Sequence, residues 1–111
     1  MSVSYFVRYD VDAADLTAFL RRYREVHVPL VARWPGLQRM VMHTPVEWRD
    51  PFPVNRGKAV LMAQLEFDSE AAMNQAFASP ERAAAREDFK HFMTFEGTVT
   101  HQAMKSEEVW P

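Results

Sequence analysis

A chain of 111 residues is close to the usual size of one domain, so we expect a single unit spanning residues 1–111. Its 13 Lys and Arg residues are balanced by 15 Asp and Glu residues and form no basic stripe, which argues against a nucleic-acid partner. Cysteine is absent, so disulfides and thiolate metal sites are excluded. Because no apolar run approaches the roughly 20 residues that span a bilayer, and no signal peptide is evident, we expect a soluble, cytoplasmic protein without membrane contact.

The apolar residues include eight Phe, seven Met, three Trp and three Tyr. A small domain has difficulty hiding so much apolar surface. The composition therefore indicates an apolar pocket, a subunit interface, or both. A densely aromatic monomeric core is the alternative.

The first predicted element is a strand over Val3–Tyr9, where alternate residues share a face. Asp12 then offers an N-cap for a helix, and Asp15 adds a negative charge near the helix N-terminus. The helix is expected to span Ala13–Arg33. Its apolar stripe consists of Leu16, Phe19, Leu20, Tyr23, Val26, Leu30, Val31 and Trp34.

His27 also lies on this stripe, two residues before Pro29. Pro29 lacks a backbone N–H and disfavours the helical conformation of the residue before it, so a kink or break is predicted near His27. The charged residues that lie off the stripe are Arg21, Arg22, Arg24 and Glu25.

Three strands and two helices complete the predicted elements. The strands span Leu37–Thr44, Ala59–Phe67 and Gly97–Met104. Asp68 or Ser69 caps the helix after the third strand, and Ser79 caps a further helix over Pro80–Met93. The core-facing residues of that last helix are expected to include Ala85, Phe89, Phe92 and Met93.

A long segment, Pro45–Lys58, separates the second and third strands. Loops of this length in small domains are often functional or mobile. Its aromatic residues, Trp48 and Phe52, argue against a purely solvated linker. We predict that residues Val46–Gly57 form a lid or a dimer-spanning arm.

The order of the elements predicts an α+β, ferredoxin-like βαββαβ fold, in which helices cover one face of a four-stranded antiparallel sheet. The apolar residues expected on the other face are Phe6, Met40, Met42, Val60 and Met62. Because a contiguous exposed apolar patch marks association or ligand binding, we expect a homodimer in which two sheets pack face to face.

No dinucleotide-binding, P-loop, zinc-protease or nucleophile-elbow motif is present. The four histidines are not spaced as metal ligands, so neither a metal nor a cofactor is predicted. His27 is the leading catalytic candidate, because an imidazole that titrates near neutrality can shuttle protons. The alternative is a structural histidine bonded to a carbonyl freed at the kink.

Other polar residues can be assigned more weakly. Glu87 or Asp88 could orient His27, although a solvated helix face with Arg86 and Lys90 is the simpler interpretation. The residues expected to bind substrate are Phe6, Arg8, Met40, Met62, Gln64, His43 and His101. The tyrosines Tyr5, Tyr9 and Tyr23 are expected in the core.

The segment from Tyr23 to Val31, followed by Trp34-Pro35-Gly36-Leu37, resembles the signature of EthD-domain proteins. These are small dimeric α+β barrel proteins named after a component of ethyl tert-butyl ether degradation. Weaker similarities are Leu65–Ala72, Ser79-Pro80-Glu81, Asp88-Phe89 and Phe92. The Pro45–Lys58 loop is longer than the family leads us to expect. The resemblance implies a dimeric barrel and a pocket position for His27.

Barrels related to this family include cofactor-independent monooxygenases, polyketide cyclases and muconolactone isomerases. The leading hypothesis is therefore an enzyme acting on a small apolar or aromatic molecule, without a metal or tightly bound cofactor. Its chemistry would be proton transfer or direct oxygenation, with His27 as acid or base. The alternatives are a non-catalytic binding or accessory protein for a hydrophobic metabolite, and a structural dimerisation module.

Overall fold

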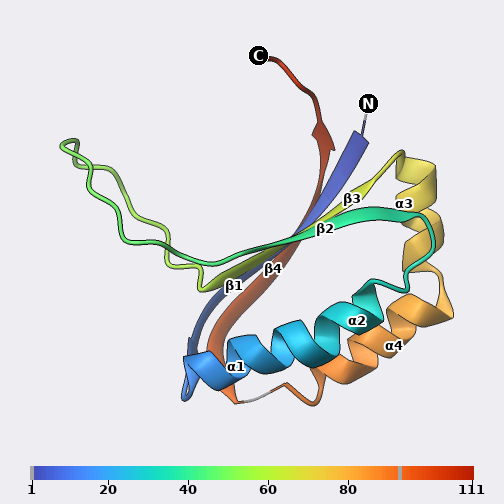
Figure 1. The fold of residues 1–111 in the computed structure, drawn as a ribbon, viewed down its shortest axis with the longest axis horizontal. Helices are drawn as coiled ribbons and strands as arrows, with labels where there is room; N and C mark the ends of the chain where they lie inside the picture. Colours follow the sequence, from blue (N-terminus) through green and yellow to red (C-terminus); the bar gives the residue numbers. More distant parts are fainter. Residues whose placement is uncertain (1, 93) are drawn as a thin grey trace.

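The computed structural model describes residues 2–92 and 94–111 (Figure 1). Its elements are β1 (Ser2–Ala13), α1 (Leu16–Arg22), the π-helical turn η1 (Tyr23–His27), α2 (Val28–Val31), β2 (Leu37–His43), β3 (Leu61–Phe67), α3 (Glu70–Phe77), α4 (Pro80–Phe89) and β4 (Phe95–Ser106). None of these helices is long and apolar enough to cross a membrane.

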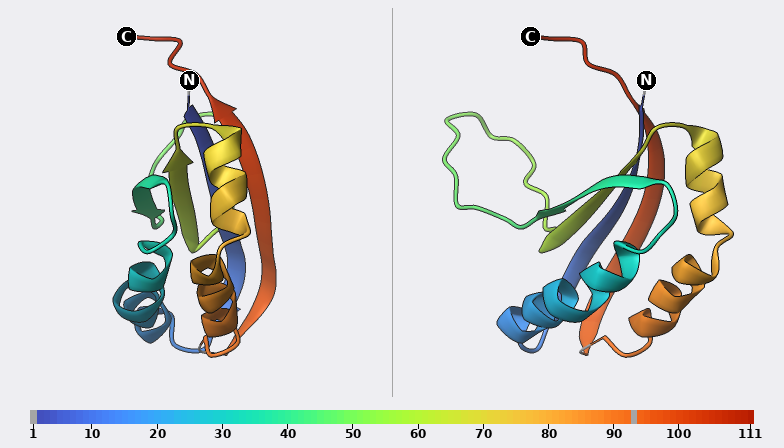
Figure 2. Two further views of the ribbon diagram at one scale, coloured as in Figure 1. Left: turned by 90° about the vertical axis from the view of Figure 1, so that its right-hand side faces the viewer. Right: turned by 45° about the vertical axis from the view of Figure 1, so that its right-hand side comes forward.

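The four strands form one sheet in the order β2-β3-β1-β4, and each neighbouring pair is antiparallel. The described helices all lie on one face of this sheet (Figures 1 and 2). The second helical connection is divided into α3 and α4. This arrangement confirms the predicted ferredoxin-like α+β fold. The opposite side of the sheet is called the open face below.

The first strand is longer than its alternating pattern indicates. β1 continues to Ala13 because its pairing with β4 extends to the pair formed by Ala13 and Phe95. The predicted cap at Asp12 is therefore wrong, since Asp12 still belongs to the strand. Asp15 caps α1 instead, and its carboxylate accepts a hydrogen bond from the backbone N–H of Ala18 at 3.0 Å.

The irregularity predicted near His27 is a π-helical turn rather than a break. The backbone N–H of Val28 donates to the carbonyl of Tyr23, five residues earlier. Pro29 then lies in the first turn of α2, a position that proline tolerates. The aligned buried residues along this helical segment are Phe19, Tyr23, His27 and Val31. In an α-helix of 3.6 residues per turn, residues four positions apart do not lie directly above one another, so such a row turns slowly around the helix. The π-helical turn contains more residues per turn and compensates for this rotation, which keeps the four side chains on one side.

A β-bulge in β2 decides which face its side chains occupy. The register shifts just after Leu37, so that Met40 pairs with Leu65 and Met42 pairs with Ala63. Both methionines consequently pack against the core on the helical side. Their predicted place on the open face is wrong, because one extra residue inverts the alternation of side chains.

The open face contains fewer apolar side chains than predicted. Phe6 and Met62 lie there, on strands whose odd-numbered residues face the helices. Val60 precedes β3 and packs against the core instead. Met104 of β4 pairs with Ser4 of β1 on the open face and is 48% exposed.

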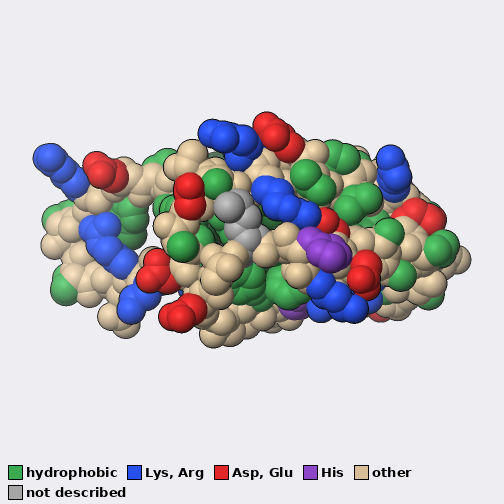
Figure 3. Space-filling model, turned by 90° about the horizontal axis from the view of Figure 1, so that it is seen from below, with side chains coloured by type: hydrophobic (Ala, Val, Ile, Leu, Met, Phe, Trp, Pro, Cys, Tyr) green, Lys and Arg blue, Asp and Glu red, His purple; other side chains and the backbone are tan. Residues whose placement is uncertain are grey.

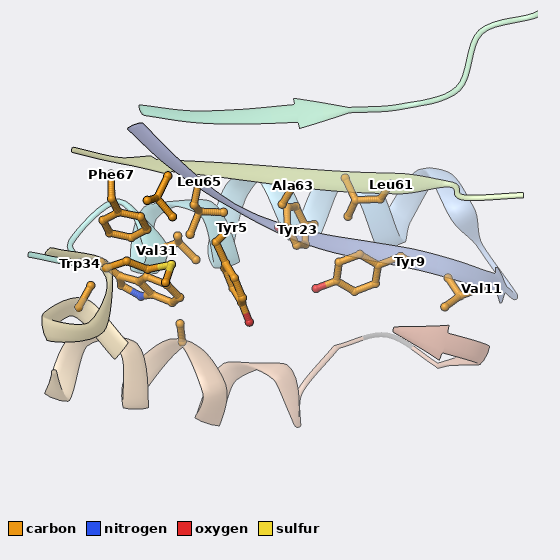
Figure 4. Packing of buried hydrophobic residues seen from close by; sticks show 14 of the residues in the cluster. Tyr5, Tyr9, Val11, Tyr23, Val31, Trp34, Leu61, Ala63, Leu65 and Phe67 are labelled. Atoms are coloured by element: carbon orange, nitrogen blue, oxygen red, sulfur yellow. The ribbon is translucent and has the colours of Figure 1, made fainter. Parts of the chain in front are cut away.

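The main core fills the layer between sheet and helices (Figure 4). The expected core tyrosines, Tyr5, Tyr9 and Tyr23, are each buried there. Tyr5 projects from β1 toward α4, with its hydroxyl at the α4 end of the side chain. Burying these rings leaves their hydroxyl groups inside the protein, where they need polar neighbours.

Ser69 and Ser79 cap α3 and α4 as predicted, each accepting a hydrogen bond from a backbone N–H at 3.1 Å. α4 ends at Phe89, before the predicted end at Met93, which lies outside the described residues. Ala85 is buried, and Phe89 and Phe92 pack against the core. The predicted inward direction is therefore confirmed for Ala85 and Phe89 of α4 and for Phe92, which follows the helix.

The segment between β2 and β3 projects from the sheet on the side away from the helices (Figure 2). The guanidinium carbon of Arg56 lies 3.9 Å from the ring centroid of Trp48, and the same side chain donates to the carbonyl of Trp48. Trp48 is 46% exposed and Phe52 is 73% exposed. A single chain thus leaves both rings substantially uncovered, and their role as a lid or arm stays a prediction.

Candidate functional site

A cavity of about 40 Å³ lies between the helices and the sheet. Its lining residues are Tyr5, Val7, Tyr9, Tyr23, His27, Val31, Trp34, Leu65, Arg82, Ala85, Arg86, Phe89 and His101. They come from β1, β3, β4 and α4, from the first helical segment, which consists of α1, η1 and α2, and from the turn after it. A cavity of this size can hold water, since one molecule needs only about 10–15 Å³ of accessible space. A larger ligand would need lining side chains to move.

His27 is held at this cavity by a carboxylate. Its Nδ1 atom lies 3.0 Å from Oδ2 of Asp88 on α4. Asp88 also accepts two hydrogen bonds from the guanidinium of Arg22, at 2.7 and 3.2 Å. The bidentate geometry fixes the carboxylate, which in turn fixes the imidazole. With Nδ1 engaged, Nε2 is the ring nitrogen available for proton exchange.

Of the two alternatives for Asp88, the structure supports the orienting contact with His27, and the simpler interpretation of a solvated helix face is wrong for this residue. Neighbouring Glu87 does belong to that face and accepts a hydrogen bond from Lys90 at 3.0 Å. Arg22, placed off the apolar stripe, is partly buried because it reaches across to Asp88. Charged residues beside an apolar stripe can thus form ion pairs with a neighbouring helix. Sequence periodicity does not reveal such pairs, because it describes each helix alone.

The surroundings of His27 favour its neutral form. Burial lowers the pKa of His27, and the hydrogen bond that its Nδ1 makes to the Asp88 carboxylate opposes this effect only partly. The bonds from Arg22 lower the pKa of Asp88, so the carboxylate stays ionised. The rings of Tyr23 and Phe92 pack against the imidazole at centroid distances of 5.1 and 4.8 Å. A neutral, oriented imidazole at a cavity can act as a general base.

A second polar pair lines the cavity from the sheet. The hydroxyl of Tyr5 is hydrogen-bonded to Nδ1 of His101, on the neighbouring strand β4. Burial raises the pKa of Tyr5 and lowers the pKa of His101, and the charges of Arg86 and Arg82 lower the pKa of His101 further. The tyrosine is therefore protonated and the histidine neutral at neutral pH.

The predicted substrate-binding residues divide between the two faces of the sheet. His101 lines the cavity with His27, whereas Met40 lies on the helical side without lining it. The predicted residues on the open face are Phe6, Arg8, Met62, Gln64 and His43. The structure therefore brings only His101 together with His27, because residues of opposite parity on one strand point to opposite faces.

The open-face residues form a polar network of their own. Nε2 of His43 lies 3.1 Å from Oε1 of Gln64, which approaches Ser4, and Ser4 is bonded to Ser106 at 2.8 Å. The chain of contacts crosses the sheet from β2 to β4. Arg8 pairs instead with Asp10 at 2.9 Å. Among the described residues no group of three or more histidine or acidic side chains is close enough to hold a metal.

The sequence prediction missed Trp34, Arg82 and Arg86 as residues of the site. Trp34 was assigned only to the apolar stripe, Arg86 was assigned to a solvated helix face, and Arg82 was not assigned. The sequence does contain a pattern that could have placed the two arginines at the site, because residues 82, 85, 86 and 89 have the spacing of one helical face. Seen from the helical side, cationic and anionic side chains are interspersed on the surface, so surface charge does not mark this face (Figure 3).

Comparison with known proteins identifies relatives. A family model described as the EthD domain matches residues 12–96. An uncharacterised 11.0 kDa protein of the thcB-thcC intergenic region in Rhodococcus erythropolis is 38% identical over 98 residues, which cover 88% of this chain and 89% of that protein.

Solved structures share the fold. An EthD family protein from Bacillus halodurans is 25% identical with a TM-score of 0.78, over 96% of this chain and all of that chain. SnoaB, a cofactor-independent oxygenase from Streptomyces nogalater, is 16% identical with a TM-score of 0.62, over 99% and 97%. A dimeric ferredoxin-like protein from Thermobifida fusca is 10% identical with a TM-score of 0.64, over 94% and 90%. The last two likenesses concern the fold alone.

The family model covers most of the chain and includes the segment that carries His27, Asp88 and the cavity-lining arginines. The Rhodococcus relative extends the similarity over nearly nine-tenths of the sequence. The chain therefore belongs to the EthD domain family.

Proposed function

We propose that this protein is an enzyme that removes or transfers a proton on a small apolar or aromatic molecule, with His27 as the general base. The observation that carries the proposal is the Arg22–Asp88–His27 chain of hydrogen bonds, which ends at the cavity. The Asp88 carboxylate positions the imidazole, and burial keeps it unprotonated. Tyr5 and His101 supply a second polar pair at the same cavity.

Removal of a proton from a carbon next to a carbonyl, or from the hydroxyl of a phenol, is a first step shared by isomerisation, cyclisation and oxygenation by direct reaction with oxygen. The fold is shared with SnoaB, a cofactor-independent oxygenase, which is compatible with the last of these. The apolar wall of the cavity, formed by residues such as Val7, Val31 and Leu65, would exclude water from the reacting centre.

We further propose a homodimer in which the open faces of two sheets pack together. The support is the apolar side chains on that face, the partly buried Phe6 and Met62 and the exposed Met104, together with the dimeric state of the Thermobifida protein. Such packing would leave the cavity on the helical side of each sheet.

The test of the proposed enzyme follows exchange of acidic C–H protons with D₂O by NMR. Suitable probes are enolisable carbonyl compounds that carry an aromatic ring, such as the neutral ketone 2-tetralone and the α-keto acid phenylpyruvate. His27→Gln should lower the exchange rate by roughly 10²–10⁴-fold, whereas exposed His91→Gln should not change it. An oxygen electrode run in parallel identifies oxygenation. Binding of a probe with no His27-dependent exchange would support a non-catalytic binding protein instead.

A further inference from the structure

One end of the cavity presents hydrogen-bond donors that have no acceptor. Nε1 of Trp34 and Nε of Arg82 are buried, and neither has a partner among the described residues. Trp34 as a whole is only 7% exposed. An unpaired buried donor costs free energy, so these two donors need an acceptor in the cavity, which water or a bound ligand can supply. Both residues line the cavity.

The cavity wall near these donors is positively charged. Arg82 and Arg86 lie one helical turn apart on α4 and both contribute to the wall. None of the described lining residues is acidic, and the Asp88 carboxylate that contacts His27 is already paired with Arg22. The wall therefore offers two cations and an indole N–H without an internal counter-ion.

Arg82 is held in place by aromatic rings rather than by a carboxylate. Its guanidinium carbon lies 4.7 Å from the ring centroid of Phe77 and 6.0 Å from that of Trp34. A guanidinium stacked in this way keeps its N–H groups in a fixed fork, which matches the two oxygens of a carboxylate.

We propose that the cavity binds a small aromatic or apolar acid, whose carboxylate is held by Arg82 and the indole N–H of Trp34. The apolar body of the ligand then lies toward His27, between the tyrosines of β1 and the first helical segment. This inference names the substrate class of the proposed enzyme and rests on that function for its catalytic meaning. Binding itself can be tested without turnover.

The size of the cavity sets a condition on this ligand. A volume of about 40 Å³ does not admit an aromatic ring, so side chains must move on binding. Arg86 is exposed, and its guanidinium carbon lies 5.2 Å from the centroid of the half-buried Phe89 ring. These two side chains of α4 are the ones that we expect to shift.

The experiment compares benzoate with benzamide, a neutral molecule of nearly the same shape, by calorimetry and by NMR of the indole N–H of Trp34. Benzoate should bind about 10- to 100-fold more tightly, the range expected for hydrogen bonds to a charged group. Arg82→Gln should abolish this preference, and Arg82→Lys should restore part of it. Arg21→Gln removes the same charge from an exposed position on α1 and should leave the preference unchanged.

Equal binding of benzoate and benzamide to the unmodified protein, or no binding of either, would overturn the inference whatever the variants do. So would an Arg82→Gln protein that keeps the benzoate preference. The proposed catalytic role of His27 can be contradicted independently of the acid-binding site. If benzoate recognition depends on Arg82 while His27→Gln keeps full proton exchange, the acid-binding site stands and the base assignment does not.

Discussion

Nδ1 of His27 lies 3.0 Å from Oδ2 of Asp88, although 61 positions separate the two residues in the chain. The contact joins the π-helical turn after α1 to the last full turn of α4. It gives the imidazole a fixed orientation, and it converts a carboxylate on a mostly exposed helix into part of the site.

The first prediction concerns this contact. The carboxylate of Asp88 raises the pKa of His27 against the opposing effect of burial. Asp88→Asn removes that charge, so the pKa of His27 should fall further below its ordinary value. An NMR titration of the imidazole resonances measures the change. Glu87→Gln, at the adjacent exposed carboxylate, is the matched control and should leave the titration of His27 unaltered.

Stability should decrease as the pH falls below about 6.5, the value of an unperturbed histidine. Burial lowers the pKa of His27 and of His101, so between the lowered and the ordinary pKa the unfolded chain binds protons that the folded chain does not. The free energy of unfolding therefore falls with decreasing pH across this window and levels off below the folded-state values. Urea denaturation at several pH values measures the slope.

The same experiment has a matched control. His27→Gln and His101→Gln should each reduce the slope of stability with pH in this window, because each removes one of the histidines whose pKa is lowered. His91→Gln, at an exposed position after α4, should not reduce it. An unchanged slope in both buried variants would contradict the assignment of the pH dependence to these histidines.

The proposed dimer predicts that Met62→Lys weakens self-association. The substitution places a charge on the open face, and burying an unpaired charge between two sheets costs several kcal/mol. Sedimentation equilibrium should show monomers at micromolar concentration. Leu16→Lys, a comparable change at a 37% exposed leucine on the helical side, should leave the dimer intact. A stable monomer formed by the unmodified protein would contradict the interface outright.

The long loop between β2 and β3 is predicted to cover apolar surface, either as a lid or as an arm that reaches the partner of the proposed dimer. If Phe52 is buried in that way, Phe52→Ser should raise the dissociation constant of the dimer about tenfold or more, since burial of a phenylalanine contributes about 1.5–3 kcal/mol. Val109→Ser, at an exposed residue of the C-terminal tail, serves as the control. Identical dissociation constants for the two variants would show that the loop is only a connector, provided that ligand binding is unchanged as well.

Gly97 should not tolerate a side chain. Its φ is +128°, and a Cβ there would lie 2.3 Å from the carbonyl oxygen of Asp10 on β1. Gly97→Ala should therefore lower the free energy of unfolding by about 2–4 kcal/mol, measured by urea denaturation. At Gly57 an added Cβ would meet only Arg8, at 3.5 Å, so Gly57→Ala should be close to neutral. Equal effects of the two substitutions would contradict the backbone geometry of β4.

Local patterns in the sequence were sufficient for the order of the elements. Alternation along β1 and β3, the serine caps of α3 and α4, and the missing N–H of Pro29 each act over a few residues, so they can be interpreted without knowledge of the fold. The place of His27 on the buried side of the first helical segment follows from the same kind of pattern.

Only the tertiary structure decided which distant residues join His27. The bulge that turns Met40 and Met42 inward depends on pairing with β3, and the position of His101 depends on pairing with Val7 of β1. Asp88 reaches His27 because two helices pack side by side at one particular register. Periodicity specifies which side of an element is apolar, but it carries no information on the rotation and offset of a partner element. That is why the sequence by itself determined the fold and the candidate base, whereas packing determined the carboxylate, the arginines and the cavity around it.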